Sequence, residues 1–179
     1  MSPPGEGAAT AEADRRLARI GAQFALAVVG AVPAWVEHSV LRVLDAFEAA
    51  GGKLGSEDGR EGVRARARQS GEQAAEALRG PLQRLLASDV DAQSATPLVL
   101  VRQLVAFPTA VLAGAGVPPV ARDRFAEQHF PDDRYGLTPA SLAVLGEGPA
   151  DLALAWGAAK AAAHRARHRH PSSNPDDGP

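Results

Sequence analysis

Between two ends rich in Pro and Gly, the apolar residues of this chain recur at spacings of three and four. One run holds Leu17, Ile20, Phe24, Val28 and Ala31, which share one face of a helix. No segment shows the alternation of apolar and polar residues that predicts a strand. The 179 residues are enough for one domain with its own core. We therefore expect an all-α fold, a single compact helical domain of about six to eight helices with disordered termini.

The composition of the two ends sets the expected limits of the domain. Residues 1–9 and 169–179 have little to bury, so we expect both to be disordered tails. The helical domain is then expected over residues 10–168. Aromatic residues make up only 4% of the chain, so its core must be built largely from Leu, Val and Ala.

Prolines are expected to mark where helices begin, end or kink. A proline inside a helix lacks an amide donor and clashes with the preceding turn. We therefore expect a second helix to follow Pro33, a kink or a division at Pro81 and a helix end near Pro108. A proline suits the first helical position, where Thr96-Pro97 and Thr138-Pro139 predict helix starts. Three further limits are expected: a helix end at Gly51-Gly52, a helix start at Pro119 and its end near His129.

Charge and cysteine content exclude several classes of site and partner. The formal net charge of −2 gives no general attraction to nucleic acid, which is not an expected partner. The chain has no cysteine, which excludes disulfides, thiolate nucleophiles and cysteine-based zinc sites. We expect no cofactor and no metal. Motifs for phosphate loops, dinucleotides and serine nucleophiles do not occur in the sequence.

The N-terminal apolar segment allows two interpretations. Residues 20–36 are apolar apart from Gln23, and three arginines precede them. A membrane anchor or an export signal is one interpretation. We favour a buried core helix in a cytoplasmic protein, because acidic residues are mixed into the leader and the run is short for a bilayer.

A cluster of polar residues late in the chain is the candidate polar site. It could hold a cation or an acid–base pair, since carboxylates near a turn suit both roles. Turn formation and helix capping are the alternative, and we favour them. The residues of this cluster are Arg122, Asp123, Glu127, Asp132, Asp133 and Tyr135.

The last helix carries two further patterns. His164 and His168 are four apart and could share a metal, although the arginines between them favour a basic helix end instead. Small residues at Ala153, Gly157 and Ala161 predict close approach of a neighbouring helix. Lys160 lies one turn after Trp156, which allows a cation–π contact.

Residues 96–160 resemble a group of helical proteins. The residues that prompt this include Thr96-Pro97-Leu98-Val99-Leu100-Val101-Arg102, Ala115 to Asp123, Phe130-Pro131-Asp132-Asp133 and Ala155 to Lys160. They are similar to small, Ala- and Arg-rich, all-helical proteins of actinobacterial type that have no assigned function. The resemblance implies an all-helical domain and supplies no activity, cofactor or site residue.

We expect a non-enzymatic interaction or structural module, which binds a partner protein or forms a homo-oligomer. The expectation rests on near-neutral charge, on amphipathic helices throughout and on the lack of an assembled catalytic set. One alternative is a small-molecule or metal-dependent enzyme that uses the acidic region 123–135. A second alternative is a membrane-associated protein that uses residues 20–36.

Overall fold

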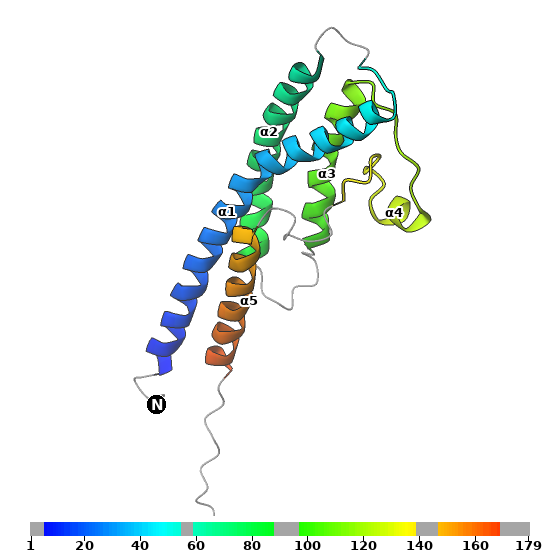
Figure 1. Ribbon diagram of the computed structural model, residues 1–179. Coiled ribbons are helices and arrows are strands. Elements are labelled where there is room, and N and C mark those ends of the chain that lie inside the picture. The colour runs from blue at the N-terminus through cyan, green and yellow to red at the C-terminus, as the bar shows by residue number, and fades with distance from the viewer. Residues whose placement is uncertain (1–5, 55–58, 88–96, 139–146, 169–179) are drawn as a thin grey trace, which may run out of the picture.

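The computed structural model describes residues 6–54, 59–87, 97–138 and 147–168. Over these residues the chain forms helices and no strand, which confirms the all-α class (Figure 1). The described part holds five helices, fewer than the six to eight expected. They are α1 (Glu6–Ala49), α2 (Gly59–Ala87), α3 (Pro97–Gly114), α4 (Arg124–His129) and α5 (Glu147–Arg167).

Part of the difference in helix number arises because prolines lie inside helices. Pro33, Pro81 and Pro108 each lie within a continuous helix, α1, α2 and α3 respectively. The expected division at Pro33 and the expected stop at Pro108 are therefore wrong, and of the two outcomes expected at Pro81 the division is wrong. An internal proline costs roughly 3 kcal/mol, and burial of the surrounding residues offsets it. Pro108 itself is fully buried. The helix expected to begin at Thr138-Pro139 falls on residues outside the described part.

Several helix limits agree with the sequence and others do not. α3 begins at Pro97, α4 ends at His129, and a turn at Gly51 follows α1. α4 begins at Arg124 rather than at Pro119, because Asp123 supplies the N-cap. α1 begins at Glu6, so residues 6–9 are helical although a tail was expected there.

A stripe of buried residues runs along α1 and changes direction around the helix axis, so that α1 packs against different helices along its length. The stripe advances by four residues at each step, and a helix turns by about 100° per residue, so the stripe drifts by about 200° from first to last. α1 packs against α5 over its N-terminal half and against α2 and α3 over its C-terminal half, and the end of α2 also lies beside residues 14–29 of α1 (Figure 1). The residues of the stripe are Phe24, Val28, Val32, Val36, Val40 and Leu44.

α1 bends where α2 crosses it. Figure 1 shows α1 changing direction between its blue and cyan parts. Pro33 explains the bend, because it removes one backbone hydrogen bond from the helix. At this crossing Gly71 of α2 is buried, and a Cβ atom on it would lie 2.6 Å from the Cα of Pro33.

α5 runs antiparallel to the N-terminal half of α1, and the two helices form an arm that we call the α1–α5 arm (Figure 1). Among the described helices α5 packs against α1 alone. Ala159 and Ala163 are buried against α1, and Trp156 stacks on Phe24 with ring centroids 6.4 Å apart. At the far end of the arm, Arg167 forms an ion pair with Asp14 at 2.6 Å.

α1 also has the length and hydropathy of a membrane-spanning helix. The described part contains one such helix, over Gly7–Ala49, and 44% of its most apolar window is buried inside the protein. Core helices of soluble proteins and signal sequences meet the same criteria, so the property alone does not choose between them.

Candidate functional site

The candidate polar site lies in the loop that follows α3, and Asp123 begins its one short helix. The Asp123 carboxylate accepts a hydrogen bond of 2.7 Å from the amide of Ala126, which is a helix N-cap. Asp123 is exposed and binds its own backbone three residues on. Its position is therefore accounted for by the start of α4.

Two arginines hold the other end of α4. The Arg122 guanidinium donates to the carbonyl oxygen of Phe130 at 2.7 Å, and Arg102 of α3 donates to the carbonyl oxygen of His129 at 2.6 Å. The last carbonyls of a helix have no partner within the helix, so these contacts satisfy them. The arginines fasten α4 to the rest of the loop and to α3.

Asp133 organises the end of the loop from a fully buried position. Its carboxylate accepts hydrogen bonds from the amide of Leu137 at 2.7 Å and from the amide of Thr138 at 2.8 Å. The Thr138 hydroxyl also donates to it. Three donors from residues four and five positions later close a turn around the carboxylate, which is the role that aspartate often has in loops.

Tyr135 fastens the same loop to the residues that follow α3. Its buried hydroxyl donates to the carbonyl oxygen of Val117 at 2.8 Å. Burial raises the pKa of this phenol above its ordinary value, and the positive charge of Arg134 opposes part of that rise. The amide of Val120 also donates to the carbonyl oxygen of Arg134, so the two ends of the loop are joined twice.

The structure therefore separates the six residues of the candidate polar site. Asp133 and Tyr135 are buried and bind backbone, while Arg122 and Asp123 hold the two ends of α4. Glu127 and Asp132 are exposed. In the described part of the chain, no group of three or more His, Asp or Glu side chains could hold a metal ion.

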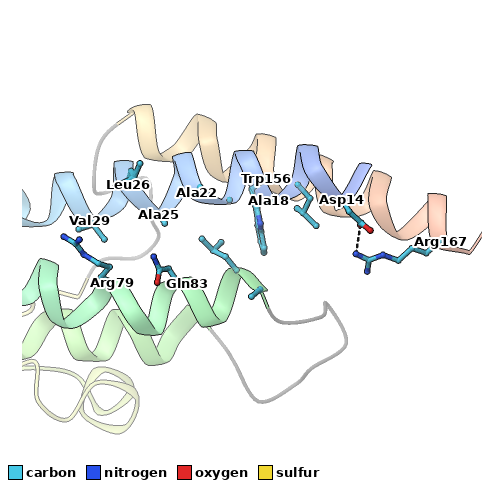
Figure 2. A pocket seen from close by; sticks show the side chains of 14 residues that line it. Asp14, Ala18, Ala22, Ala25, Leu26, Val29, Arg79, Gln83, Trp156 and Arg167 are labelled. Atoms are coloured by element: carbon cyan, nitrogen blue, oxygen red, sulfur yellow. Dashed lines mark hydrogen bonds and ion pairs between the residues drawn. The ribbon is translucent and has the colours of Figure 1, made fainter. Parts of the chain in front are cut away.

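A different region has the shape of a binding site. A cavity of about 580 Å³ lies between α1, α2 and α5, and we call it the α1/α2/α5 groove (Figure 2). Ligand sites of small molecules commonly have volumes of roughly 300–1,000 Å³. The groove is open to solvent, and Leu26, one of its lining residues, is 73% exposed.

Small residues of α1 form one wall of the groove, and Trp156 projects across it. The small residues are Ala18, Gly21, Ala22 and Ala25. A Cβ atom on Gly21 would lie 3.6 Å from the Trp156 ring, which shows how closely the indole passes this wall. Figure 2 shows the ring reaching from α5 past α1 toward the end of α2.

Polar side chains lie at the two ends of the groove (Figure 2). Arg79 and Gln83 of α2 stand near Val29 at one end. The ion pair of Asp14 and Arg167 stands at the other end. Between them the lining is apolar, apart from the indole nitrogen of Trp156.

The sequence did not point to this groove. Its walls come from three segments that lie far apart along the chain, and no motif joins them. One local signal was available, because Ala18, Ala22 and Ala25 recur at helical spacing. Small residues at that spacing are common wherever Ala is abundant, so the pattern alone does not indicate a groove.

Of two predictions made for the last helix, the structure confirms the cation–π contact and contradicts the close approach of a neighbouring helix. The Lys160 ammonium lies 5.1 Å from the centroid of the Trp156 ring, which confirms the cation–π contact. Gly157 and Ala161 are exposed, and a Cβ atom on Gly157 would meet nothing within 4 Å. The expected close approach at these small residues is therefore wrong for the helices of one copy.

His164 and His168 lie side by side at the exposed end of α5, with ring centroids 4.3 Å apart. Their proximity follows from their spacing, because two residues that are four apart lie on the same face of a helix.

Comparison of the chain with protein-family models, with curated proteins and with solved structures finds no match. The resemblance of residues 96–160 to helical proteins of actinobacterial type therefore stays a prediction.

Proposed function

We propose that the protein is a non-enzymatic interaction module that self-associates through the outer face of α5. The observation that carries this proposal is the exposure of Leu154, whose surface is 77% accessible on a helix that packs against α1 with its other side. A large apolar side chain exposed in this way is typical of a surface that a partner covers.

The rest of the outer face of α5 is also apolar. From Leu152 to Ala163 the only charged residue is Lys160, and its ammonium is already placed over Trp156. A solvated helix face normally carries several charges. Here the exposed residues between Leu154 and His164 are all small, namely Ala155, Gly157, Ala158 and Ala161.

The charges at the two ends of this face favour a second copy as the partner. Asp151 and Arg165 are both exposed, and neither forms an ion pair within the described part of the chain. They stand seven residues before and seven residues after Ala158, so all three share one face of the helix. If two α5 helices pack antiparallel about Ala158, Asp151 of each copy lies beside Arg165 of the other.

The loop after α3 supports the non-enzymatic part of the proposal. Of the five candidates for acid–base chemistry, Asp123, Asp133 and Tyr135 each bind a backbone group, and the other two, Glu127 and Asp132, are exposed to solvent. The positions of the first three are explained by the fold of the loop without a substrate.

The expected association is weak and reversible. α5 has 21 residues and is therefore roughly 31 Å long, so one face of it buries on the order of 300 Å² per copy. Interfaces of this size belong to transient complexes rather than to permanent dimers. The dimer is expected to form at protein concentrations of tens to hundreds of micromolar, as an order of magnitude.

Charge reversal tests both the interface and its antiparallel direction. We expect Asp151→Arg and Arg165→Asp each to weaken the dimer about tenfold or more, because each replaces two attractive pairs by two repulsive ones. An equal mixture of the two variants should form a heterodimer tighter than either homodimer. The double exchange Asp151→Arg with Arg165→Asp should restore the homodimer. Sedimentation velocity over a range of concentrations measures all four.

The double exchange is informative because it opposes the helix dipole, so a restored dimer cannot result from a more stable α5. Asp132→Arg is a control that places the same new charge on an exposed residue of the loop. A chain that stays monomeric at millimolar concentration would contradict self-association. Single reversals without effect would exclude the antiparallel α5 interface.

Membrane association through residues 20–36 is a second candidate, and the length and hydropathy of α1 support it. Against it, Phe24, Val28 and Val32 are buried within the protein. Fractionation of cells that express the full chain separates the two candidates. Recovery in the membrane fraction after a high-salt wash would support the membrane candidate, and recovery in the soluble fraction would exclude it.

A further inference from the structure

We infer that the α1/α2/α5 groove binds a long-chain carboxylic acid as a free monomer, with its alkyl chain along the groove and its carboxylate at Arg79. This site is separate from the outer face of α5, so the inference does not depend on self-association. It assigns a ligand class to a cavity that the helices leave open.

The length and the lining of the groove suit one alkyl chain. The wall formed by α1 runs from Asp14 to Val29, and 15 helical steps span roughly 22 Å. At roughly 1.25 Å per carbon, which follows from a C–C bond of about 1.5 Å at a tetrahedral angle, about 16 to 18 carbons span this length. Leu17, Leu26 and Leu86 line the groove beside the small residues of α1 and offer an apolar environment.

The charges at the ends of the groove favour an anionic head group at one end only. At the Asp14 end, the carboxylate and the guanidinium of Arg167 neutralise each other at 2.6 Å. At the Val29 end, the nearest charge on the lining is the Arg79 guanidinium, and the amide of Gln83 lies one turn further along α2. A carboxylate can therefore accept hydrogen bonds from both side chains.

Arg79 is able to accept this new partner. Its present contact is an ion pair of 3.3 Å with Glu76, whose side chain is 74% exposed. An exposed pair of residues three apart on a helix stabilises little. A ligand carboxylate that is held in place by its buried chain can compete with it.

Trp156 reports on the middle of the bound chain. The indole passes beside Gly21, which is eight residues from Val29, or roughly 12 Å along α1. A bound acid with its carboxylate at Arg79 therefore places its ninth and tenth carbons near the indole. The other tryptophan, Trp35, is buried in the core and does not line the groove.

Quenching of Trp156 fluorescence by brominated acids tests the site. We expect 9,10-dibromostearate to quench saturably, below the concentration at which it forms micelles. The same acid with bromine at the second carbon should quench several-fold less. Trp156→Phe should remove the quenched component and leave the signal of Trp35 unchanged.

Two variants test the binding of the alkyl chain and of the head group separately. In each case palmitate competes with the brominated acid, and the loss of quenching measures its binding. Ala22→Phe fills the groove and should weaken binding at least tenfold. Gln23→Phe is its matched control on the neighbouring, exposed residue outside the groove and should bind normally. Arg79→Gln should weaken palmitate about tenfold and leave hexadecanol within twofold, because only the acid carries a charge.

Four results would overturn the inference. The first is a lack of saturable quenching by the monomeric acid. The second is equal binding by Ala22→Phe and the unchanged protein, which would place the acid elsewhere. The third is a loss of self-association in Ala22→Phe without any acid binding, which would make the groove a protein interface. The fourth is binding to phosphatidylglycerol vesicles without binding of the monomeric acid, which would make it a membrane contact.

Discussion

Gly71 of α2 lies directly against the backbone of Pro33 of α1. A Cβ atom on Gly71 would come within 2.6 Å of the Pro33 Cα and within 2.9 Å of its carbonyl oxygen. Both neighbours are backbone atoms, so neither can rotate away. The crossing of the two longest described helices therefore depends on a residue without a side chain.

Gly71→Ala should destabilise the protein by roughly 1–3 kcal/mol, because the added methyl group forces α1 and α2 apart. Gly30→Ala is the control, since Gly30 lies on the exposed side of α1 and a Cβ atom there meets nothing within 4 Å. That control should stabilise α1 by up to about 1 kcal/mol, because alanine favours the helix. Urea unfolding followed by circular dichroism measures both changes, and equal stability of the two variants would contradict the close crossing.

Asp133→Ala should cost roughly 2–4 kcal/mol of unfolding free energy, because it leaves the buried amide of Leu137 and the half-buried amide of Thr138 without their acceptor. Its neighbour provides a matched control, since Asp132 is exposed and Asp132→Ala should change stability by less than about 0.5 kcal/mol. Thermal unfolding of the two variants compares them directly. Similar melting temperatures would mean that the buried carboxylate does not hold the loop.

Tyr135→Phe should cost about 1 kcal/mol, since the hydrogen bond to the Val117 carbonyl is lost. The tyrosine should also make stability depend on alkaline pH. Burial raises the pKa of the folded phenol above the unfolded value of about 10, so the unfolded chain releases its proton first. The contribution of Tyr135 is therefore complete below pH 10 and is lost as the pH rises through the folded pKa.

The measurement is a comparison of Tyr135→Phe with the unchanged protein in urea between pH 8 and pH 11. Tyr135 is the only tyrosine of the chain, so the phenylalanine variant removes this titration completely. The difference in stability between the two proteins should shrink above pH 10. A difference that stays constant over this range would show that the phenol ionises equally in both states.

Trp156→Ala should loosen the α1–α5 arm without unfolding the rest of the protein. α5 packs on α1 alone among the described helices, and the stacking of Trp156 on Phe24 is a large part of that contact. Amide hydrogen exchange should therefore accelerate in α5 and in the first turns of α1, while α2 and α3 keep their protection. Uniform acceleration over all helices would show instead that the arm unfolds together with the remainder.

The helical class and several helix limits could be predicted from local chemistry. Pro97 begins α3 because a first helical residue needs no amide donor, and α4 ends at His129 before Phe130-Pro131. The expected breaks at Pro33 and Pro108 were wrong because tertiary burial outweighs the local cost of proline. That burial depends on which helices become neighbours, and local patterns do not contain this information.

In the candidate polar site, too, local sequence patterns did not reveal which groups become neighbours. The sequence singled out Asp133 and Tyr135 by their chemistry, and both are built into the loop by specific contacts. Which atoms they contact depends on the turn that brings Leu137 and Val117 to them. The α1/α2/α5 groove was not predicted at all, since Trp156 reaches it only through the long-range pairing of α5 with α1.

The pairing of α5 with α1 also brings together the two ends of the helical part of the chain. The Thr10 hydroxyl donates to the carbonyl oxygen of Ala166, which is 156 positions later, at 3.4 Å. The first turns of α1 and the last turns of α5 therefore lie side by side. A circular permutant that joins α5 to α1 and opens the chain at Lys53 would keep every described helix intact. It would also make the contact between α1 and α5 local in sequence, whereas this contact now joins distant positions.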